Sequence, residues 1–272
     1  MNYQVTWFAA FLLALAATAA HAAPATSGGG WQVVLAAGDD QEPVFDDATR
    51  TLARRLQDAG VPARSIHRLS ASPGEIRSGV EAATTANVLR SIAQLPARAG
   101  DRCFIFLTSH GQYNEGVWLA RSQRALHPQE LAQALSGGCA AVPTVVVVSA
   151  CYSGGFAAGT MIKPNRIILT ASRRDRPSFG CQVERTYSFF DECFLQALPE
   201  AAHWQTVFRA TRGCVSREEK ALGETPSDPQ AYFGPAAAGL SARFGAETAP
   251  QRVTTIGTAP SRRVTWSATS RS

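Results

Sequence analysis

Residues 104–111 read FIFLTSHG, and residues 145–151 read VVVVSAC. Each stretch is a short apolar run, typical of a buried strand, and each ends on a reactive side chain: His110 in the first and Cys151 in the second. In an open parallel sheet, ligands bind in the crevice beyond the carboxyl ends of the strands. The pattern therefore predicts that an imidazole and a thiol lie on one surface of the protein.

The surrounding sequence alternates between predicted strands and predicted helices. Strands are expected at residues 31–36, 65–69, 116–120 and 166–171, and helices at residues 45–59, 85–95, 189–198 and 204–222, with a further helix opened by Pro128 and a helix cap at Thr85. This alternation favours an α/β fold with a mostly parallel central sheet. A chain of 272 residues is long enough for one large core of this kind.

The two ends of the chain differ from this middle part. Residues 5–20 are almost wholly apolar and lead to a small-residue site at residues 20–22, which is typical of a cleaved signal peptide. We expect a signal peptide at 1–22, a flexible linker at 23–30, a folded domain at 31–235 and a flexible tail at 236–272. The apolar run is shorter than the roughly 20 residues of a spanning helix, so no stable membrane insertion is expected after cleavage; an uncleaved anchor is the alternative. The predicted location is the periplasm or the exterior.

Export would place the six cysteines in an oxidising compartment, where they are expected to pair. If Cys151 stays free, five cysteines remain, and so at least one other thiol is unpaired. Cys103 and Cys139 both precede predicted strands and can bridge at the sheet end opposite Cys151. The other pair is drawn from Cys181, Cys193 and Cys214. The spacing contains no C-x-x-C doublet, which argues against a structural zinc site.

The formal net charge of +5 gives little information about partners. Much of the excess follows residue 245, where Arg252, Arg262, Arg263 and Arg271 accompany Glu247. No basic stripe interleaved with aromatic residues is present, and nucleic-acid binding is not expected. The other histidines in the predicted domain, His67, His127 and His203, lack mutual metal-ligand spacing, so packing or capping roles are expected for them.

His110 and Cys151 together have the chemistry of a cysteine hydrolase. A thiol needs a base to become a nucleophile, and a departing amine needs a proton; one histidine can serve both needs. Backbone N–H groups of Gly111 and Cys151 can stabilise the oxyanion of the intermediate. Taken singly, a buried cysteine is more often structural than catalytic. The joint arrangement favours the functional interpretation.

The Ser-His-Gly after the first strand and the Ser-Ala-Cys after the second resemble the His-Gly and Ala-Cys dyad of the caspase-like cysteine peptidases, a clan that includes caspases, legumains, gingipains and separases. The sequence is most similar to the legumain family, peptidase C13. Further stretches in legumain-like order are residues 37–40, 85–95, 150–154, 178–181 and 187–191, so the resemblance covers about residues 31–235. It implies a caspase-like three-layer sandwich, in which helices flank a mostly parallel central sheet.

The resemblance also implies roles for individual residues. Cys151 would be the nucleophile, His110 the base and leaving-group acid, and Gly111 a backbone donor to the oxyanion. In legumains an asparagine after the first strand orients the histidine, and Asp40 occupies that place here. Ser109 stands where legumains carry an acidic residue before the histidine, so ligase activity is not implied.

The substrate pocket is implied by resemblance alone. Legumains read the residue before the scissile bond with acidic groups and an arginine. Asp191 stands at one of the two acidic pocket positions of legumains, and Arg176 stands at the other. The pocket arginine of legumains, which comes early in their sequence, corresponds to a position near Asp47. Ser178 belongs to the same predicted substrate-binding region. A strict preference for asparagine is therefore not implied.

The sequence thus predicts an exported cysteine endopeptidase that hydrolyses peptide or protein substrates and needs no metal or organic cofactor for the chemistry. Two alternatives stay open. Asp40 and the altered pocket are also compatible with an inactive caspase-like module that binds peptides or proteins. Ser153, followed by two glycines, weakly resembles a nucleophile elbow, but the glycine required two residues before that serine is Cys151.

Overall fold

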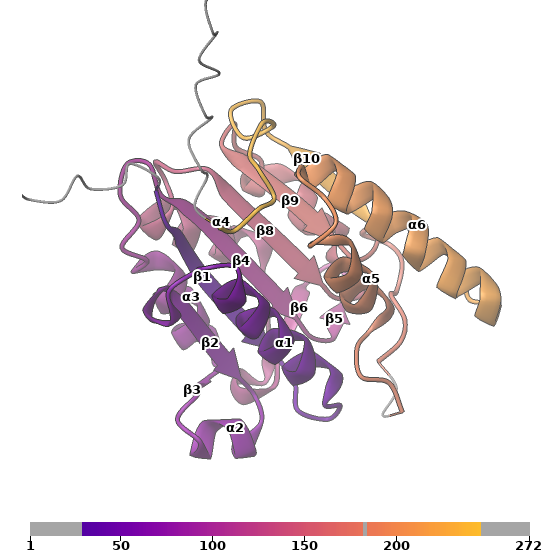
Figure 1. Ribbon diagram of the computed structural model, residues 1–272. Coiled ribbons are helices and arrows are strands. Elements are labelled where there is room, and N and C mark those ends of the chain that lie inside the picture. The colour runs from indigo at the N-terminus through magenta and orange to yellow at the C-terminus, as the bar shows by residue number, and fades with distance from the viewer. Residues whose placement is uncertain (1–28, 182–183, 246–272) are drawn as a thin grey trace, which may run out of the picture.

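The structure is a computed structural model that describes residues 29–181 and 184–245. Within these residues seven strands form one sheet in the order β10-β9-β8-β4-β1-β2-β3 (Figure 1). The strands are β1 (Trp31–Ala37), β2 (Ile66–Ser70), β3 (Glu81–Ala82), β4 (Arg102–Thr108), β8 (Thr144–Ser149), β9 (Arg166–Thr170) and β10 (Gln230–Phe233). All neighbours are parallel except β10, which runs antiparallel to β9. The predicted mostly parallel sheet is confirmed.

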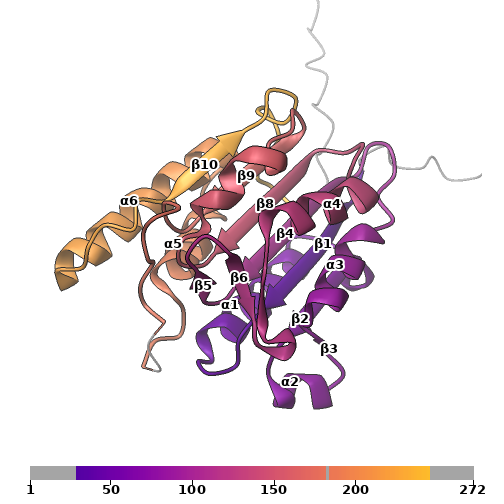
Figure 2. The ribbon, with the colours of Figure 1, turned by 180° about the vertical axis from the view of Figure 1, so that it is seen from behind.

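Helices cover both faces of this sheet and make a three-layer sandwich (Figures 1 and 2). One face packs on α1 (Val44–Asp58), α5 (Phe189–Ala197) and α6 (Trp204–Leu222), and the other packs on α3 (Thr85–Ala93) and α4 (Pro128–Gly138). Successive side chains of a strand point to opposite faces of the sheet, so they pack against different helix layers. Phe104 and Phe106 enter the first core, and Ile105 and Leu107 enter the second. Two buried faces explain why the strands are continuously apolar.

Shorter elements surround the carboxyl end of the sheet. β5 (Gly111–Gln112), β6 (Gly116–Leu119) and β7 (Arg124–Leu126) form a small antiparallel sheet. The 3-10 turns η3 (Ser153–Ala157) and η4 (Gly159–Met161) follow β8. The remaining short elements are η1 (Ala63–Ser65), α2 (Pro73–Arg77) and η2 (Ala120–Ser122). β5 and η3 therefore begin within two residues of His110 and Cys151.

One predicted helix cap needs correction, and one strand forms among prolines. The cap of α3 is Thr84, whose side chain accepts a hydrogen bond from the Asn87 backbone N–H at 3.1 Å, and not Thr85. The stretch 226–235 contains three prolines, which usually break regular structure, but it includes β10. A proline-flanked strand is possible there because β10 is an edge strand, which pairs on one side only.

The folded part continues past the predicted boundary at residue 235. Leu240 and Phe244 are buried, and Phe244 packs against Trp31 with ring centroids 4.6 Å apart. The prediction of a tail starting at residue 236 is wrong for residues 236–245. The predicted signal peptide, most of the linker and residues 246–272 lie outside the described residues. No helix in the described part is both long and apolar enough to span a membrane.

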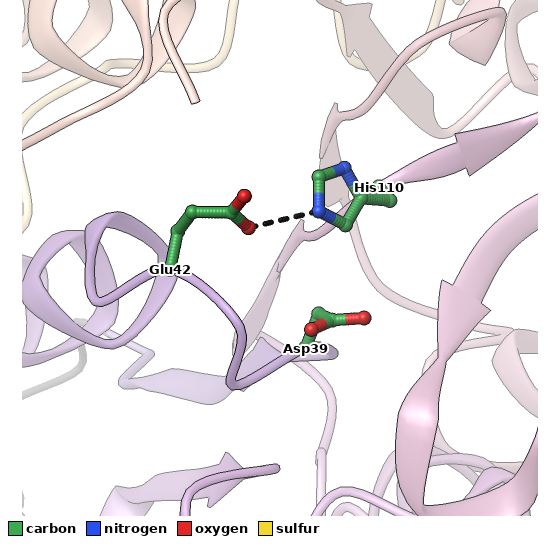
Figure 3. Close-up of side chains that lie close together, drawn as sticks. All are labelled: Asp39, Glu42 and His110. Carbon is green, nitrogen blue, oxygen red and sulfur yellow. Dashed lines mark hydrogen bonds and ion pairs between the residues drawn. The ribbon is translucent and has the colours of Figure 1, made fainter. Parts of the chain in front are cut away.

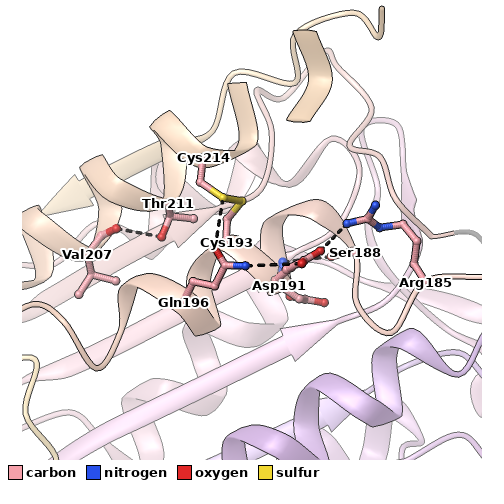
Figure 4. Close-up of a disulfide and its surroundings, with 9 residues drawn as sticks. Arg185, Ser188, Asp191, Cys193, Gln196, Val207, Thr211 and Cys214 are labelled. Atoms are coloured by element: carbon pink, nitrogen blue, oxygen red, sulfur yellow. Dashed lines mark hydrogen bonds and ion pairs between the residues drawn. A yellow bond between two sulfur atoms is a disulfide. The ribbon is translucent and has the colours of Figure 1, made fainter. Parts of the chain in front are cut away.

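Two disulfides cross-link the fold, one between the sheet and a helix layer and one within a helix layer. Cys103 at the start of β4 is bonded to Cys139 after α4, as expected. Cys193 on α5 is bonded to Cys214 on α6 (Figure 4), which settles which of the three remaining cysteines pair. Within the described residues Cys151 and Cys181 are the free thiols.

Candidate active site

The pairing of β4 with β8 brings His110 and Cys151 to one edge of the sheet. Thr108 is the register partner of Ser149, and His110 and Cys151 each lie two residues beyond these partners. The Ser109 backbone N–H donates to the Ser149 carbonyl at 3.1 Å, so the two chains stay together past the strands. Both His110 and Cys151 are partly exposed. The expected juxtaposition of the two residues is present.

Gly111 allows the two loops to approach closely. A Cβ atom at this position would lie 1.9 Å from the Cys151 carbonyl oxygen and 2.9 Å from its backbone nitrogen. Any side chain would therefore push the Cys151 backbone away. The requirement for glycine here is steric and comes from the close contact between the two loops.

The Cys151 sulfur contacts the backbone of Ser178. The Ser178 N–H donates to Sγ at 3.3 Å, and Sγ lies 3.4 Å from the Ser178 carbonyl oxygen and 3.7 Å from its hydroxyl. Ser178, predicted to bind substrate, is thus placed against the thiol itself. These contacts fix the direction of the sulfur at the sheet edge.

The His110 ring contacts a carboxylate and an aromatic ring. Its Nε2 lies 2.9 Å from Glu42 Oε2 (Figure 3), and Phe45 meets the ring edge-on at 5.2 Å between centroids. Among the described residues no hydrogen bond joins the ring to the Cys151 sulfur. Hydrogen bonds between catalytic groups are often long without substrate and tighten when it binds.

Glu42, and not Asp40, is the acidic residue that contacts the imidazole. Asp40 is exposed and its Oδ2 forms an ion pair with Arg121 at 3.1 Å. The expectation that Asp40 orients the histidine is not supported by this geometry. The order of the strands points to this loop: β1 neighbours β4, so the loop after β1, which contains Glu42, reaches the same edge as His110.

Asp191 lies beneath this edge on α5. It is 0% exposed, and Thr108 donates to its Oδ2 at 2.7 Å. Burial raises the pKa of this carboxyl to about 6, although hydrogen bonds from Thr108, Ser149 and Ser188 act in the opposite direction. Asp191 is therefore a buried residue of α5 and not a solvated one. In this conformation the carboxylate is closed to a substrate and supports the end of β4.

Arg176 and Asp47 stand at the other two positions of the legumain-like pocket, and their side chains have partners outside the dyad. The Arg176 guanidinium donates to the Pro226 carbonyl at 2.8 Å, while its own carbonyl accepts from the Tyr152 N–H at 2.9 Å. Asp47 pairs with Arg50 within α1. Arg176 therefore lies close to the thiol loop through its backbone, and Asp47 belongs to the surface of a helix.

A cavity of about 210 Å³ opens beside the residue that follows the thiol. Its lining includes Tyr152, Gly155, Phe156, Arg174 and Glu115. Tyr152 has a left-handed backbone (φ 59°), a conformation that non-glycine residues adopt rarely and that is enriched at functional sites. The cavity combines an apolar wall with one cationic and one anionic side chain.

The structure does not support Ser153 as a nucleophile. Ser153 is buried, and its hydroxyl accepts a hydrogen bond from the Ser172 N–H at 3.2 Å. The Ser153 N–H in turn donates to the Ser172 hydroxyl at 3.2 Å. This reciprocal pair fixes the loop after Cys151 and leaves the hydroxyl without access to a substrate.

Comparison with known families agrees with this geometry. The family model described as the Peptidase C13 family matches residues 80–225, which is more than half of the chain and includes both His110 and Cys151. The chain belongs to the peptidase C13 family. The predicted relationship to legumains is therefore confirmed.

Among solved structures, this C13 peptidase-family chain is similar to caspase-1 from Spodoptera frugiperda. The TM-score is 0.52 with 12% sequence identity, and the alignment covers 77% of this chain and 87% of the caspase chain. At this identity the likeness shows the fold alone, and it confirms the caspase-like sandwich. No curated protein matches the chain. The family and the fold support a function of the cysteine-peptidase type.

Proposed function

We propose that this C13-family chain is an exported cysteine endopeptidase that cleaves peptide or protein substrates with Cys151 as nucleophile and His110 as base. The observation that carries the proposal is the β4–β8 register, which puts both residues at equivalent positions beyond paired strands. The close approach of Gly111 to the Cys151 backbone supports it, because the loops that carry the two residues are in contact.

The proposed reaction proceeds in two halves. His110 accepts the proton of the Cys151 thiol as the sulfur attacks the carbonyl carbon of the scissile bond, and the N–H groups of Gly111 and Cys151 donate to the oxyanion. The intermediate collapses when His110 gives the proton to the amine, which leaves a thioester on Cys151. A water molecule, deprotonated by His110, then attacks the thioester and releases the acid and the free thiol.

Three further residues act through the dyad. Glu42 positions the imidazole through Nε2, Ser178 positions the sulfur through its backbone, and Asp191 supports the end of β4 through Thr108. The cavity beside Tyr152 accepts a substrate side chain near the scissile bond, with Arg174 and Glu115 as its charged groups. The altered pocket positions at Arg176 and Asp47 accord with a preference other than asparagine.

Export is supported by the apolar segment at residues 5–20 and by the cysteine pairing. Structural disulfides form and persist mainly in oxidising compartments, so the two pairs favour the periplasm or the exterior over the cytoplasm. Fractionation of cells that express the full chain, followed by sequencing of the mature N-terminus, tests this part. Recovery of the protein only in the cytoplasm with residues 1–22 still attached would overturn it.

The catalytic proposal is tested with the purified chain and a peptide library, together with a peptidyl acyloxymethyl ketone that alkylates active thiolates. We expect turnover and single labelling in the wild type, and loss of turnover in Cys151→Ala and in His110→Ala. Cys181→Ala is the control, because burial raises the pKa of the Cys181 thiol to about 12 and leaves it unreactive near neutral pH. The proposal fails if the processed wild type neither cleaves any peptide nor takes up the probe.

One observation favours a second candidate, a peptide-binding module without turnover. In the described structure the His110 ring contacts Glu42 and the Cys151 sulfur contacts Ser178, so each partner of the dyad is engaged separately. Peptide binding that is unchanged in Cys151→Ala, combined with no turnover by the wild type, would select this candidate. Covalent labelling of Cys151 by the ketone would exclude it.

A further inference from the structure

We propose that Asp39, Glu42 and His110 form a zinc-binding site that holds the proposed peptidase in an inactive state. One carboxylate oxygen of each acid and one ring nitrogen of His110 all lie within 4.8 Å of one another (Figure 3). A zinc ion with bonds of about 2.1 Å places its tetrahedral ligands about 3.4 Å apart, so movements of about 1 Å would close the site around the ion.

The unusual member of this group is Asp39. Its side chain is 1% exposed, and while Oδ1 accepts from the Gln41 N–H at 2.8 Å, Oδ2 has no hydrogen-bond partner among the described residues. A buried carboxylate oxygen without a partner is costly, and its occurrence in a native fold calls for an explanation. A cation bound between Asp39 and its two neighbours would satisfy that oxygen.

The other two members provide access and adaptability. His110 and Glu42 have side chains that are 36% and 21% exposed, so an ion can reach the site from solvent. Glu42 Oε2 is already 2.9 Å from His110 Nε2, and its side chain is long enough to admit an ion between the two atoms by a small shift. A water molecule would complete the tetrahedron, as at zinc sites with three protein ligands.

The donor set favours zinc over the common hard cations. Calcium and magnesium prefer ligands that are all oxygen, whereas one imidazole with two carboxylates suits zinc. The two carboxylates would also balance the charge of the ion. The site therefore differs from a general acidic cluster, which would bind calcium or magnesium weakly.

Zinc at Nε2 would stop His110 from acting as a base. A neutral imidazole bound to metal through one nitrogen carries its proton on the other, so Nδ1 would already be protonated and could not accept the thiol proton. This inhibitory consequence rests on the proposed function, but the binding of zinc does not. The ion would be an inhibitor, and the chemistry of the peptidase would not need it.

The test is isothermal titration of the untagged full chain with zinc chloride. We expect one ion per chain, and binding weakened by at least about tenfold in Asp39→Asn and in Glu42→Gln, since loss of a direct ligand should cost no less than loss of a supporting residue. Asp40→Asn is the matched control, because this neighbouring acid pairs with Arg121. Cys151→Ser should retain the affinity, which separates this site from a thiolate site.

Undiminished binding in both Asp39→Asn and Glu42→Gln would overturn the proposal, and so would loss of binding in Cys151→Ser. If Asp39→Asn does not fold, the half-buried Glu42 decides the outcome. In the peptide-cleavage assay, zinc should inhibit the wild type and a chelator should restore turnover. If the protein binds zinc but has no peptidase activity, the proposed function alone is refuted. If the protein cleaves peptides but neither binds zinc nor is inhibited by it, the zinc site alone is refuted.

Discussion

Glu42 Oε2 lies 2.9 Å from His110 Nε2, although 68 positions separate the two residues in the sequence. The contact exists because β1 and β4 are parallel neighbours, so the loop that follows β1 and the residue that follows β4 meet at one edge. It leaves Nδ1 as the ring nitrogen available for proton transfer. The orientation of the proposed base is therefore set from the first strand of the fold.

Substitution of Glu42 by Gln should lower kcat by roughly 10- to 100-fold, by analogy with the loss of residues that orient metal-binding histidines. The KM for a peptide should change little, because Glu42 positions the ring and does not bind substrate. Glu42→Asp should recover part of the loss. Steady-state kinetics on one cleaved peptide measures all three values.

Asp40→Asn is the matched comparison for this prediction. Asp40 pairs with Arg121 and not with the ring, so its substitution should leave kcat near that of the wild type. A large fall in kcat for Asp40→Asn together with wild-type activity of Glu42→Gln would show that the sequence-based assignment of Asp40 was right.

This case shows which parts of the site could be predicted from sequence. His110 and Cys151 follow continuous apolar runs, and burial of a parallel strand on both faces produces such runs directly. Glu42 could not be chosen, because the loop after β1 contains Asp39, Asp40 and Glu42, and nothing in their spacing fixes the path of a loop. The sequence-based choice of Asp40 therefore named one of three neighbouring acids, and the residue that contacts the ring is Glu42.

The extent of the fold was underestimated for a related reason. Residues 236–245 are mostly small, and the predicted tail rested on that composition. Leu240 and Phe244 nevertheless supply enough apolar surface to fill a gap beside Trp31 and Trp204. Whether a gap is present depends on how α6 and β1 pack together, and this long-range arrangement leaves no local sequence pattern.

Asp191 should make stability depend on pH. Burial raises its folded-state pKa from the ordinary value of 3.8 to about 6, so between these values the folded protein keeps a proton that the unfolded chain has lost. The contribution of Asp191 to the free energy of unfolding is therefore largest below about pH 4, and it is lost as the pH rises to about 6. A shift of about two units corresponds to about 3 kcal/mol.

Asp191→Asn should remove this dependence, because an amide can still accept the Thr108 hydrogen bond at all pH values. Denaturant unfolding of both proteins from pH 4 to pH 7 gives the measurement. The variant should gain stability relative to the wild type up to about pH 6, with no further gain above it. Asp58→Asn, at an exposed carboxyl, is the control, and a constant difference between Asp191→Asn and the wild type would contradict the prediction.

Neighbouring glycines after Cys151 should respond differently to substitution. A Cβ at Gly154 would lie 2.5 Å from the Arg174 backbone nitrogen, whereas a Cβ at Gly155 has nothing within 4 Å and Gly155 lines the cavity. Gly154→Ala should destabilise the fold by about 1–3 kcal/mol. Gly155→Leu should fold normally and reduce the cavity, which disfavours substrates with large side chains there.

Thermal unfolding measures the first effect, and a cleavage profile over peptides that differ at one position measures the second. Gly155→Ala, which adds a single methyl group, should lie between the wild type and Gly155→Leu in its side-chain preference. The cavity would not be a substrate site if the Gly155→Leu enzyme cleaved the whole peptide set with the wild-type preference.

The Cys193–Cys214 bond should contribute about 3 kcal/mol to stability, the amount expected for closing a loop with a sequence separation of 21. It ties α5 to α6 (Figure 4). Ser188 caps α5 and Asp191 lies in its first turn, and both side chains contact residues at the carboxyl end of the sheet. The double variant Cys193→Ala/Cys214→Ala should therefore unfold at lower denaturant concentration and lose activity at a lower temperature than the wild type. Cys181→Ala, which removes a free thiol, is the control. Equal unfolding midpoints for the double variant and the wild type would contradict the predicted contribution of this bond to stability.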